Sequence, residues 1–144
     1  MISSKTTAMI CHGLAISPML VGGLVYAISN SYMSYHAAAT NYMWQELAPG
    51  VQILFLAMLN GAGSLMLLTA LTLILLLTIP FRQNQRWSFL AIPIIGICAL
   101  LITIRAAILV DLNTAANPPW LWLLPVIGLF VIGLFLSYKN TDKK

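Results

Sequence analysis

The sequence has 144 residues, of which 60% are hydrophobic and only 7% are charged, and its net charge is +4 at pH 7. Soluble domains carry about a quarter charged residues, so this composition excludes a water-soluble globular fold. Six of the seven basic residues are spread over three segments and Arg105 stands alone, without a stripe or a run, which argues against nucleic-acid binding.

Four long apolar stretches follow one another along the chain, at roughly residues 8–29, 50–79, 88–110 and 120–137. An apolar run of about 18 or more residues can cross a bilayer as an α-helix, which satisfies its backbone hydrogen bonds internally. The sequence therefore predicts an all-α fold: a polytopic membrane protein whose four transmembrane helices form one bundle and one domain over residues 1–144. Its first expected partner is the lipid bilayer.

The first stretch also resembles a secretory signal peptide, because Lys5 precedes it and the Val-Tyr-Ala of residues 25–27 is similar to a cleavage site. It is longer than a typical signal core, however, and it contains His12 and Pro18. We expect it to be retained as the first transmembrane helix. In the later stretches, Pro80 predicts a helix end near Ile79, since proline lacks an amide donor.

Basic residues indicate the orientation of the bundle. The segments before the first stretch, between the second and third, and after the fourth contain Lys5, Arg82, Arg86, Lys139, Lys143 and Lys144. The two opposite loops contain no Lys or Arg and carry Glu46 and Asp111 instead. Because Lys and Arg concentrate in cytoplasmic loops, both termini are predicted to be cytoplasmic.

Small residues recur at a spacing of four, which allows helices to approach closely in lipid. The pairs are Gly13 and Ser17, Ala57 and Gly61, and Asn60 and Ser64, and a longer stripe joins Ala99, Thr103 and Ala107. These patterns favour packing within the bundle or, alternatively, self-association or contact with another membrane protein.

Arg105 is the one charge inside an apolar stretch. At 1.5 Å per residue it lies about 25 Å along the third helix, near the outer edge of the hydrocarbon. It either anchors the helix in the outer headgroups or pairs with a carboxylate, of which Glu46 is preferred and Asp111 is second. Pairing requires that the helical face it shares with Cys98, Leu101 and Ile102 turn inward.

Further polar side chains are expected at the same depth. Asn60 could line a pocket or make an interhelical hydrogen bond, and the aromatic loop around His36 could cap the bundle or lie on the membrane surface. The candidate binding site is an outward-facing polar pocket for a quinone headgroup, a lipid headgroup or a small anion. Its members are His36, Glu46, Asn60, Arg105 and Asp111.

The sequence lacks the residues that several kinds of catalytic or metal site require. His12 and His36 are expected at opposite ends of the first helix, so they cannot ligate one haem. The two histidines and three carboxylates are too scattered for a metal site. Cys11 and Cys98 form no Cys-x-x-Cys motif, and no Gly-x-Ser-x-Gly motif occurs. We therefore expect no catalytic residue, no metal and no cofactor, although a bound lipid or quinone remains compatible with the pocket.

Several short motifs resemble those of small uncharacterised bacterial inner-membrane proteins: Tyr35-His36-Ala37-Ala38, Trp44, Glu46-Leu47, Pro49-Gly50, Pro80-Phe81-Arg82 and Arg86-Trp87. The layout also resembles that of DoxX-like four-helix proteins. This resemblance implies a location in a bacterial inner membrane. The leading interpretation is a non-enzymatic accessory subunit or a lipid- or quinone-binding subunit. The alternatives are a membrane enzyme or redox component that uses the outer pocket, and a small oligomeric transporter.

Overall fold

The computed structural model describes residues 3–139, which contain α-helices and 3-10 turns but no strand. The elements are α1 (Ser4–Ala27), α2 (Ser34–Thr40), η1 (Trp44–Glu46), α3 (Pro49–Thr78), α4 (Arg86–Asn113), η2 (Trp120–Trp122) and α5 (Leu123–Tyr138). Within this part of the chain, α1, α3, α4 and the segment Trp120–Tyr138 are long and apolar enough to cross a membrane. This confirms the prediction of an all-α fold with four long apolar helices, and it is consistent with a helical membrane bundle.

The helix ends differ from the expected ones by a few residues, and a polar side chain bonds to the backbone at each of the two largest extensions, the start of α1 and the end of α4. The Ser3 hydroxyl accepts a hydrogen bond from the Thr6 amide at 3.2 Å, and this cap starts α1 four residues earlier than expected. At the end of α4, the Asn113 side chain donates to the Leu109 carbonyl oxygen at 2.7 Å and continues the helix beyond Val110.

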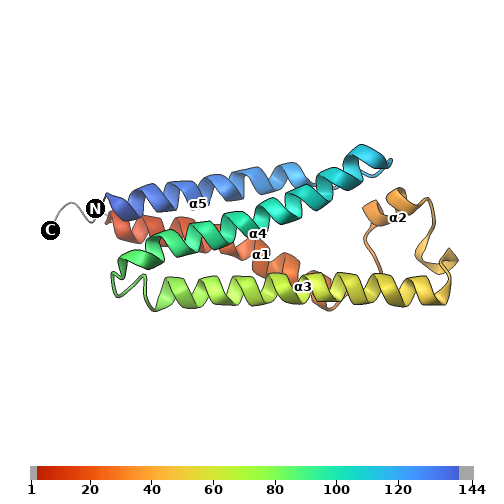
Figure 1. The fold of residues 1–144 in the computed structure, drawn as a ribbon, viewed down its shortest axis with the longest axis horizontal. Helices are drawn as coiled ribbons and strands as arrows, with labels where there is room; N and C mark the ends of the chain where they lie inside the picture. Colours follow the sequence, from red (N-terminus) through yellow and green to blue (C-terminus); the bar gives the residue numbers. More distant parts are fainter. Residues whose placement is uncertain (1–2, 140–144) are drawn as a thin grey trace.

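The first turn of α1, the last turn of α5 and the loop between α3 and α4 lie at one end of the bundle (Figure 1). We call it the basic end, because it carries Lys5, Arg82, Arg86 and Lys139. Lys143 and Lys144, which also entered the prediction of orientation, lie outside the described residues. The Lys5 ammonium donates to the Arg82 carbonyl oxygen at 2.8 Å, which ties the start of α1 to the α3–α4 loop.

Aromatic rings and a histidine fill the core near the basic end. Phe81, from the α3–α4 loop, and Phe130, from α5, are fully buried, and Phe81 packs edge-on against Phe89 with ring centroids 4.9 Å apart. The imidazole of His12 lies 5.8 Å from the Phe81 ring and 5.9 Å from the Phe130 ring, between centroids. A Cβ on Gly133 would lie 2.8 Å from the ring nitrogens of His12, so only glycine leaves room for this ring.

Halfway along the bundle, α1 crosses α3 through two glycines. A Cβ on Gly23 would lie 2.8 Å from the Leu67 amide nitrogen, and a Cβ on Gly63 would collide with the backbone of Tyr26 and Ala27. In lipid, such direct backbone contact is a main source of helix association. The sequence pairs singled out for packing did not include this crossing.

Pro18 interrupts the backbone hydrogen bonds of α1 without ending the helix. Proline has no amide proton, so the Leu14 carbonyl oxygen loses its usual partner. The Ser17 hydroxyl donates to this oxygen at 3.0 Å. The helix therefore continues to Ala27 with that carbonyl satisfied, as the absence of water in a bilayer core requires.

Candidate functional site

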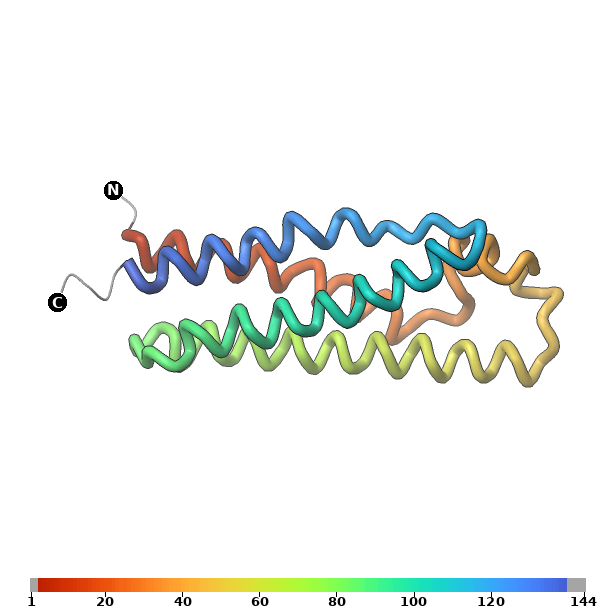
Figure 2. The backbone as a smooth tube through the Cα atoms, turned by 45° about the horizontal axis from the view of Figure 1, so that its top comes forward, coloured from red at the N-terminus to blue at the C-terminus, as the bar shows by residue number. Residues whose placement is uncertain are grey.

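A cleft of about 650 Å³ lies in the half of the bundle away from the basic end. It is bounded by α1, α3, α4 and the start of the last long segment, and α2 contributes to the end farthest from the basic residues. The ribbon and the tube both show α3 and α4 close together at the basic end and separating toward α2 (Figures 1 and 2). The cleft occupies the space that this separation opens.

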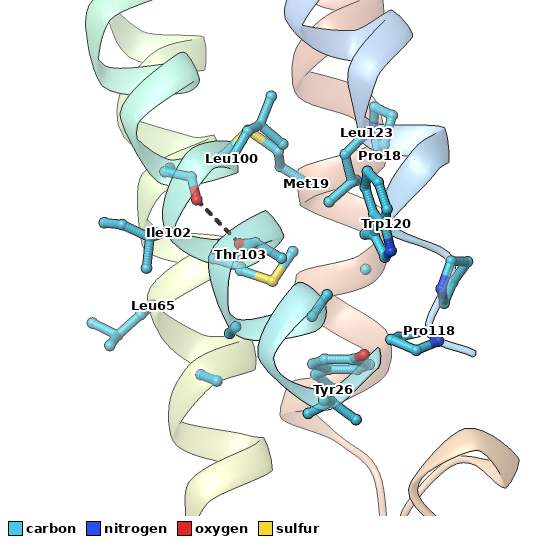
Figure 3. A pocket seen from close by; sticks show the side chains of 18 of the residues that line it. Pro18, Met19, Tyr26, Leu65, Leu100, Ile102, Thr103, Pro118, Trp120 and Leu123 are labelled. Carbon is cyan, nitrogen blue, oxygen red and sulfur yellow. Dashed lines mark hydrogen bonds between the residues drawn. The ribbon is translucent and has the colours of Figure 1, made fainter. Parts of the chain in front are cut away.

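The wall of the cleft is mainly apolar. Figure 3 shows Leu65 and Ile102 on one side, Trp120 and Leu123 on the other, and Tyr26 across one end. The further apolar lining residues are Pro18, Met19, Gly22, Ala62, Met66, Ala99, Leu100, Ala106, Ala107, Val110, Pro118 and Pro119. Among the described residues, no Asp, Glu, Lys or Arg lines this space.

Two threonines on the wall direct their hydroxyl protons to their own helices. The Thr69 hydroxyl donates to the Leu65 carbonyl oxygen at 2.8 Å, and the Thr103 hydroxyl donates to the Ala99 carbonyl oxygen at 3.1 Å (Figure 3). Threonines in helices commonly make this bond to the residue four positions earlier. The polar groups that remain available therefore lie at the α2 end of the cleft.

Tyr26 at the end of α1 and Tyr35 in α2 are joined by a hydrogen bond between their hydroxyls. Burial raises the pKa of the Tyr35 phenol, and the hydrogen bond to Tyr26 raises it further. Tyr35 is therefore a neutral phenol at physiological pH. The pair contains two hydroxyl protons and uses one of them internally, so one proton is left to donate.

His36 is half-buried in α2, next to Tyr35. Its Nδ1 accepts a hydrogen bond from the Met33 amide at 3.0 Å, which assigns the proton of the neutral ring to Nε2. Burial lowers the pKa of His36, so the neutral form predominates at pH 7. The cleft is thus lined by an imidazole whose free polar group is a donor.

Aromatic packing holds α2 and the following loop against the start of α3. The Tyr32 ring meets the Trp44 ring at 5.0 Å and the Phe55 ring at 5.6 Å, between centroids, both in edge-to-face geometry. The Tyr32 hydroxyl also donates to the Tyr42 carbonyl oxygen. The segment between α1 and α3 is therefore folded, and Tyr32 packs it against Phe55 of α3. Its placement over the bundle or on the membrane surface stays a prediction.

Of the five predicted site residues, His36 is the one that lines the cleft. Glu46 is exposed in η1 and accepts the Met43 amide at 2.6 Å. Asp111 accepts the indole N–H of Trp120 at 3.1 Å and so orients a ring of the cleft without lining it. Asn60, with its amide nitrogen turned toward α1, donates to the carbonyl oxygens of Tyr26 at 2.9 Å and Ser29 at 3.1 Å. Asn60 therefore makes the interhelical hydrogen bond that was the alternative interpretation.

The prediction that Arg105 pairs with Glu46 or Asp111 is wrong for the described residues. Within residues 3–139 its guanidinium forms no ion pair or hydrogen bond, and the side chain is exposed. The physical reason is the rotation of α4, which turns Cys98 and Leu101 outward together with Arg105. The alternative, an anchor that reaches the headgroups, stays a prediction.

The sequence interpretation missed Tyr26, Tyr35 and Trp120 as members of one site. Their signal was weak, because aromatic residues near the ends of transmembrane helices usually belong to the interfacial belt. The stripe of Ala99, Thr103 and Ala107 was interpreted as a surface for helix packing or self-association. In the structure, all three residues line the cleft. Small side chains here leave space between helices.

Metal binding finds no support in the described part of the chain, where no group of three or more His, Cys, Asp or Glu side chains could hold an ion. Comparisons with known protein families, with curated proteins and with solved structures find no match. The resemblance to DoxX-like proteins and to small bacterial inner-membrane proteins therefore stays a prediction.

Proposed function

We propose that this protein is a non-enzymatic subunit of a bacterial inner membrane that holds one lipid-like molecule, a lipid or a quinone, in the cleft. The observation that carries this proposal is the cleft itself, with its apolar wall and with the polar groups that remain available for a ligand at one end. Sites for small molecules are typically about 300–1,000 Å³, mostly apolar, with a few polar groups that orient the ligand. At about 650 Å³, the cleft lies within this range.

Access from the bilayer supports a lipid-like occupant. Leu65 and Ile102, on the lip of the cleft, are 66% and 71% exposed and face the surroundings of the bundle. An apolar tail can therefore enter sideways between α3 and α4 without crossing water. A site that opens to lipid is filled most readily by a molecule that is already dissolved there.

The distribution of charge supports an orientation. Lys5, Arg82, Arg86 and Lys139 gather at the basic end, and the positive-inside rule assigns such an end to the cytoplasm. In this orientation both termini are cytoplasmic, and the polar end of the cleft, with Tyr35 and His36, lies in the outer leaflet.

The lining also favours binding over catalysis. Among the described residues it contains no carboxylate, serine or cysteine, so His36 has neither a serine or thiol nucleophile to activate nor a carboxylate to orient it. The phenol of Tyr35 has a raised pKa and stays protonated at neutral pH. A binding or accessory role requires only the apolar wall and the hydrogen-bonding end.

The test is to fill the cleft and measure what co-purifies. Ala107→Phe places a ring in the cleft, whereas Leu109→Phe places the same ring on an exposed position of the same helix. After gentle extraction, native mass spectrometry should detect a bound amphiphile on the wild type and on Leu109→Phe. Ala107→Phe should lose at least about nine-tenths of it, since a well-packed ring excludes the ligand. Equal amounts on both folded variants would contradict the proposal.

A further inference from the structure

The charged residues at the level of the cleft, Arg105 and Asp111, do not line it. Arg105 is exposed on another face of α4, and Asp111 is engaged with the indole of Trp120. A phosphate or carboxylate in an apolar cleft needs a cation or several donors, because an unpaired charge is costly in a medium of low dielectric constant. The described lining supplies no cation. This disfavours an anionic headgroup.

The polar groups at the α2 end are oriented to donate hydrogen bonds. The Nδ1 atom of His36 is occupied by the Met33 amide, so the ring presents Nε2–H. The Tyr26–Tyr35 pair retains one hydroxyl proton. The indole N–H of Trp120 is already used by Asp111. A ligand that satisfies this end must supply acceptors.

Flat side chains surround the same end. The phenol of Tyr26, the indole of Trp120 and the ring of Pro118 line the cleft (Figure 3), and Pro119 lines it as well. Aromatic faces favour offset or edge-on contact with other rings. A slot of this kind suits a flat head more closely than a bulky, hydrated one.

We infer that the cleft selects an uncharged amphiphile whose head carries carbonyl oxygens, and that His36 Nε2 and the Tyr26–Tyr35 pair donate to those oxygens. This inference rests on the proposed function and names the chemistry of its ligand. Two sources share that chemistry: the ring of a quinone and the ester head of a neutral glyceride. The apolar tail lies along Leu65, Met66 and Ile102 and leaves the cleft between α3 and α4.

The experiment compares three probes: decylubiquinone, dioctanoylglycerol and dioctanoylphosphatidylglycerol. The two glycerolipids have identical acyl chains and differ only in the head. Each is titrated against the whole purified protein in mild detergent, and the bound fraction is measured by native mass spectrometry. At least one uncharged probe should bind about tenfold or more tightly than phosphatidylglycerol. The tighter of the two uncharged probes identifies the source of the head.

Variants then test the donors. The double variant Tyr26→Phe/Tyr35→Phe removes both hydroxyls and keeps the rings, so binding of the uncharged probe should weaken by about fivefold or more. His36→Phe should weaken it similarly. Because His36→Phe also removes the acceptor for the Met33 amide, its folding is checked by thermal unfolding, and the tyrosine pair remains an independent test. Tyr42→Phe, on an exposed ring outside the cleft, is the control and should leave binding unchanged.

The outcomes separate the two proposals. Equal or tighter binding of phosphatidylglycerol would overturn the inference about the head and leave the lipid-binding function standing. Binding of the uncharged probes that is insensitive to both the tyrosine pair and a folded His36→Phe would overturn the assignment of donors. Failure of all three probes to bind, with no amphiphile on the freshly extracted protein, would overturn the proposed function as well.

Discussion

Small residues occur at both ends of the bundle, but they allow close packing at one end and border a cavity at the other. At the basic end, rings pack directly against glycines: Gly133 faces the imidazole of His12, and a Cβ on Gly96 would collide with the ring of Phe130. At the other end, Ala99 and Ala107 face a space of about 650 Å³. Small side chains in a membrane helix thus allow either close packing or a cavity, and the neighbouring side chains decide which one forms.

The contrast also assigns different roles to the two ends. The basic end is filled by buried aromatic side chains and tied by Lys5 to the α3–α4 loop, so it should dominate stability. The cleft end retains free donors and an opening to the surroundings, so it should dominate binding. Substitutions at the two ends should therefore separate loss of stability from loss of ligand.

The largest effect is expected for Phe130→Ala at the basic end. Phe130 is fully buried, and truncation of a buried phenylalanine typically costs about 3–5 kcal/mol through lost contacts and the cavity left behind. Phe135, on the same helix, is 71% exposed, so Phe135→Ala is the matched control and should cost less than about 1 kcal/mol. Unfolding in mixed micelles measures both. Equal losses would show that the basic end is not the stable core.

Gly63→Ala should weaken the α1–α3 crossing. The new Cβ would collide with the backbone of Tyr26 and Ala27, and overpacking of this kind typically costs about 1–3 kcal/mol. Gly61→Ala, two residues away, meets nothing within 4 Å and should leave the free energy of unfolding within about 0.5 kcal/mol of the wild type. The same micelle titration reports the difference. A neutral Gly63→Ala would argue against backbone contact at this crossing.

His12→Met should increase stability. The imidazole is fully buried, and neither of its nitrogens has a hydrogen-bond partner within the described residues. An unsatisfied buried polar group costs about 1–3 kcal/mol, whereas methionine has a similar volume and adapts to irregular spaces. The gain should be about 1 kcal/mol in the unfolding titration, with ligand binding unchanged. A loss of stability would indicate that His12 has a polar partner in the membrane.

His36 should make the cleft end sensitive to pH. Burial lowers its pKa in the folded state below the ordinary value of 6.5, so the unfolded state binds more protons near that pH. Its contribution to stability is present above about pH 6.5 and is lost as the pH falls through the folded pKa. Thermal unfolding between pH 8 and pH 5 should therefore show a smaller decline for His36→Phe than for the wild type. Parallel curves would exclude His36 as the titrating group.

The smallest effect is expected for Arg105→Ala. The side chain is exposed and has no partner within residues 3–139, so its loss should change the free energy of unfolding by less than about 0.5 kcal/mol. In a double-mutant cycle with Glu46→Gln, the coupling should stay within a few tenths of a kilocalorie per mole. A larger coupling would restore the ion pair that the sequence suggested.

The four long helices were predictable because length and hydropathy are local properties of the chain. The surroundings of Arg105 were not, since they depend on the rotation of α4 about its axis. α4 is apolar around most of its circumference, so its sequence does not specify which face turns inward. The Asn60 bond to α1 was one of two alternatives, and only the position of the α1 end decided between them.

The cleft itself depends on how far apart two helices lie. Ala99, Thr103 and Ala107 form the same small-residue stripe whether another helix or a ligand covers it. Gly23 and Gly63 fix the distance between α1 and α3, but they are far apart in the sequence and no pattern within one helix connects them. Only His36 of the five candidate residues was both predicted and found on the cleft wall.

Photo-crosslinking in native membranes tests the cleft most directly. A single diazirine-bearing aliphatic residue replaces either Met66, which lines the cleft, or Leu68, which is 62% exposed on the same helix. After irradiation, mass spectrometry identifies the adducts. Position 66 should capture one dominant uncharged amphiphile, whereas position 68 should capture phospholipids in proportion to their abundance in the membrane. Identical phospholipid adducts at both positions would contradict a selective binding cleft.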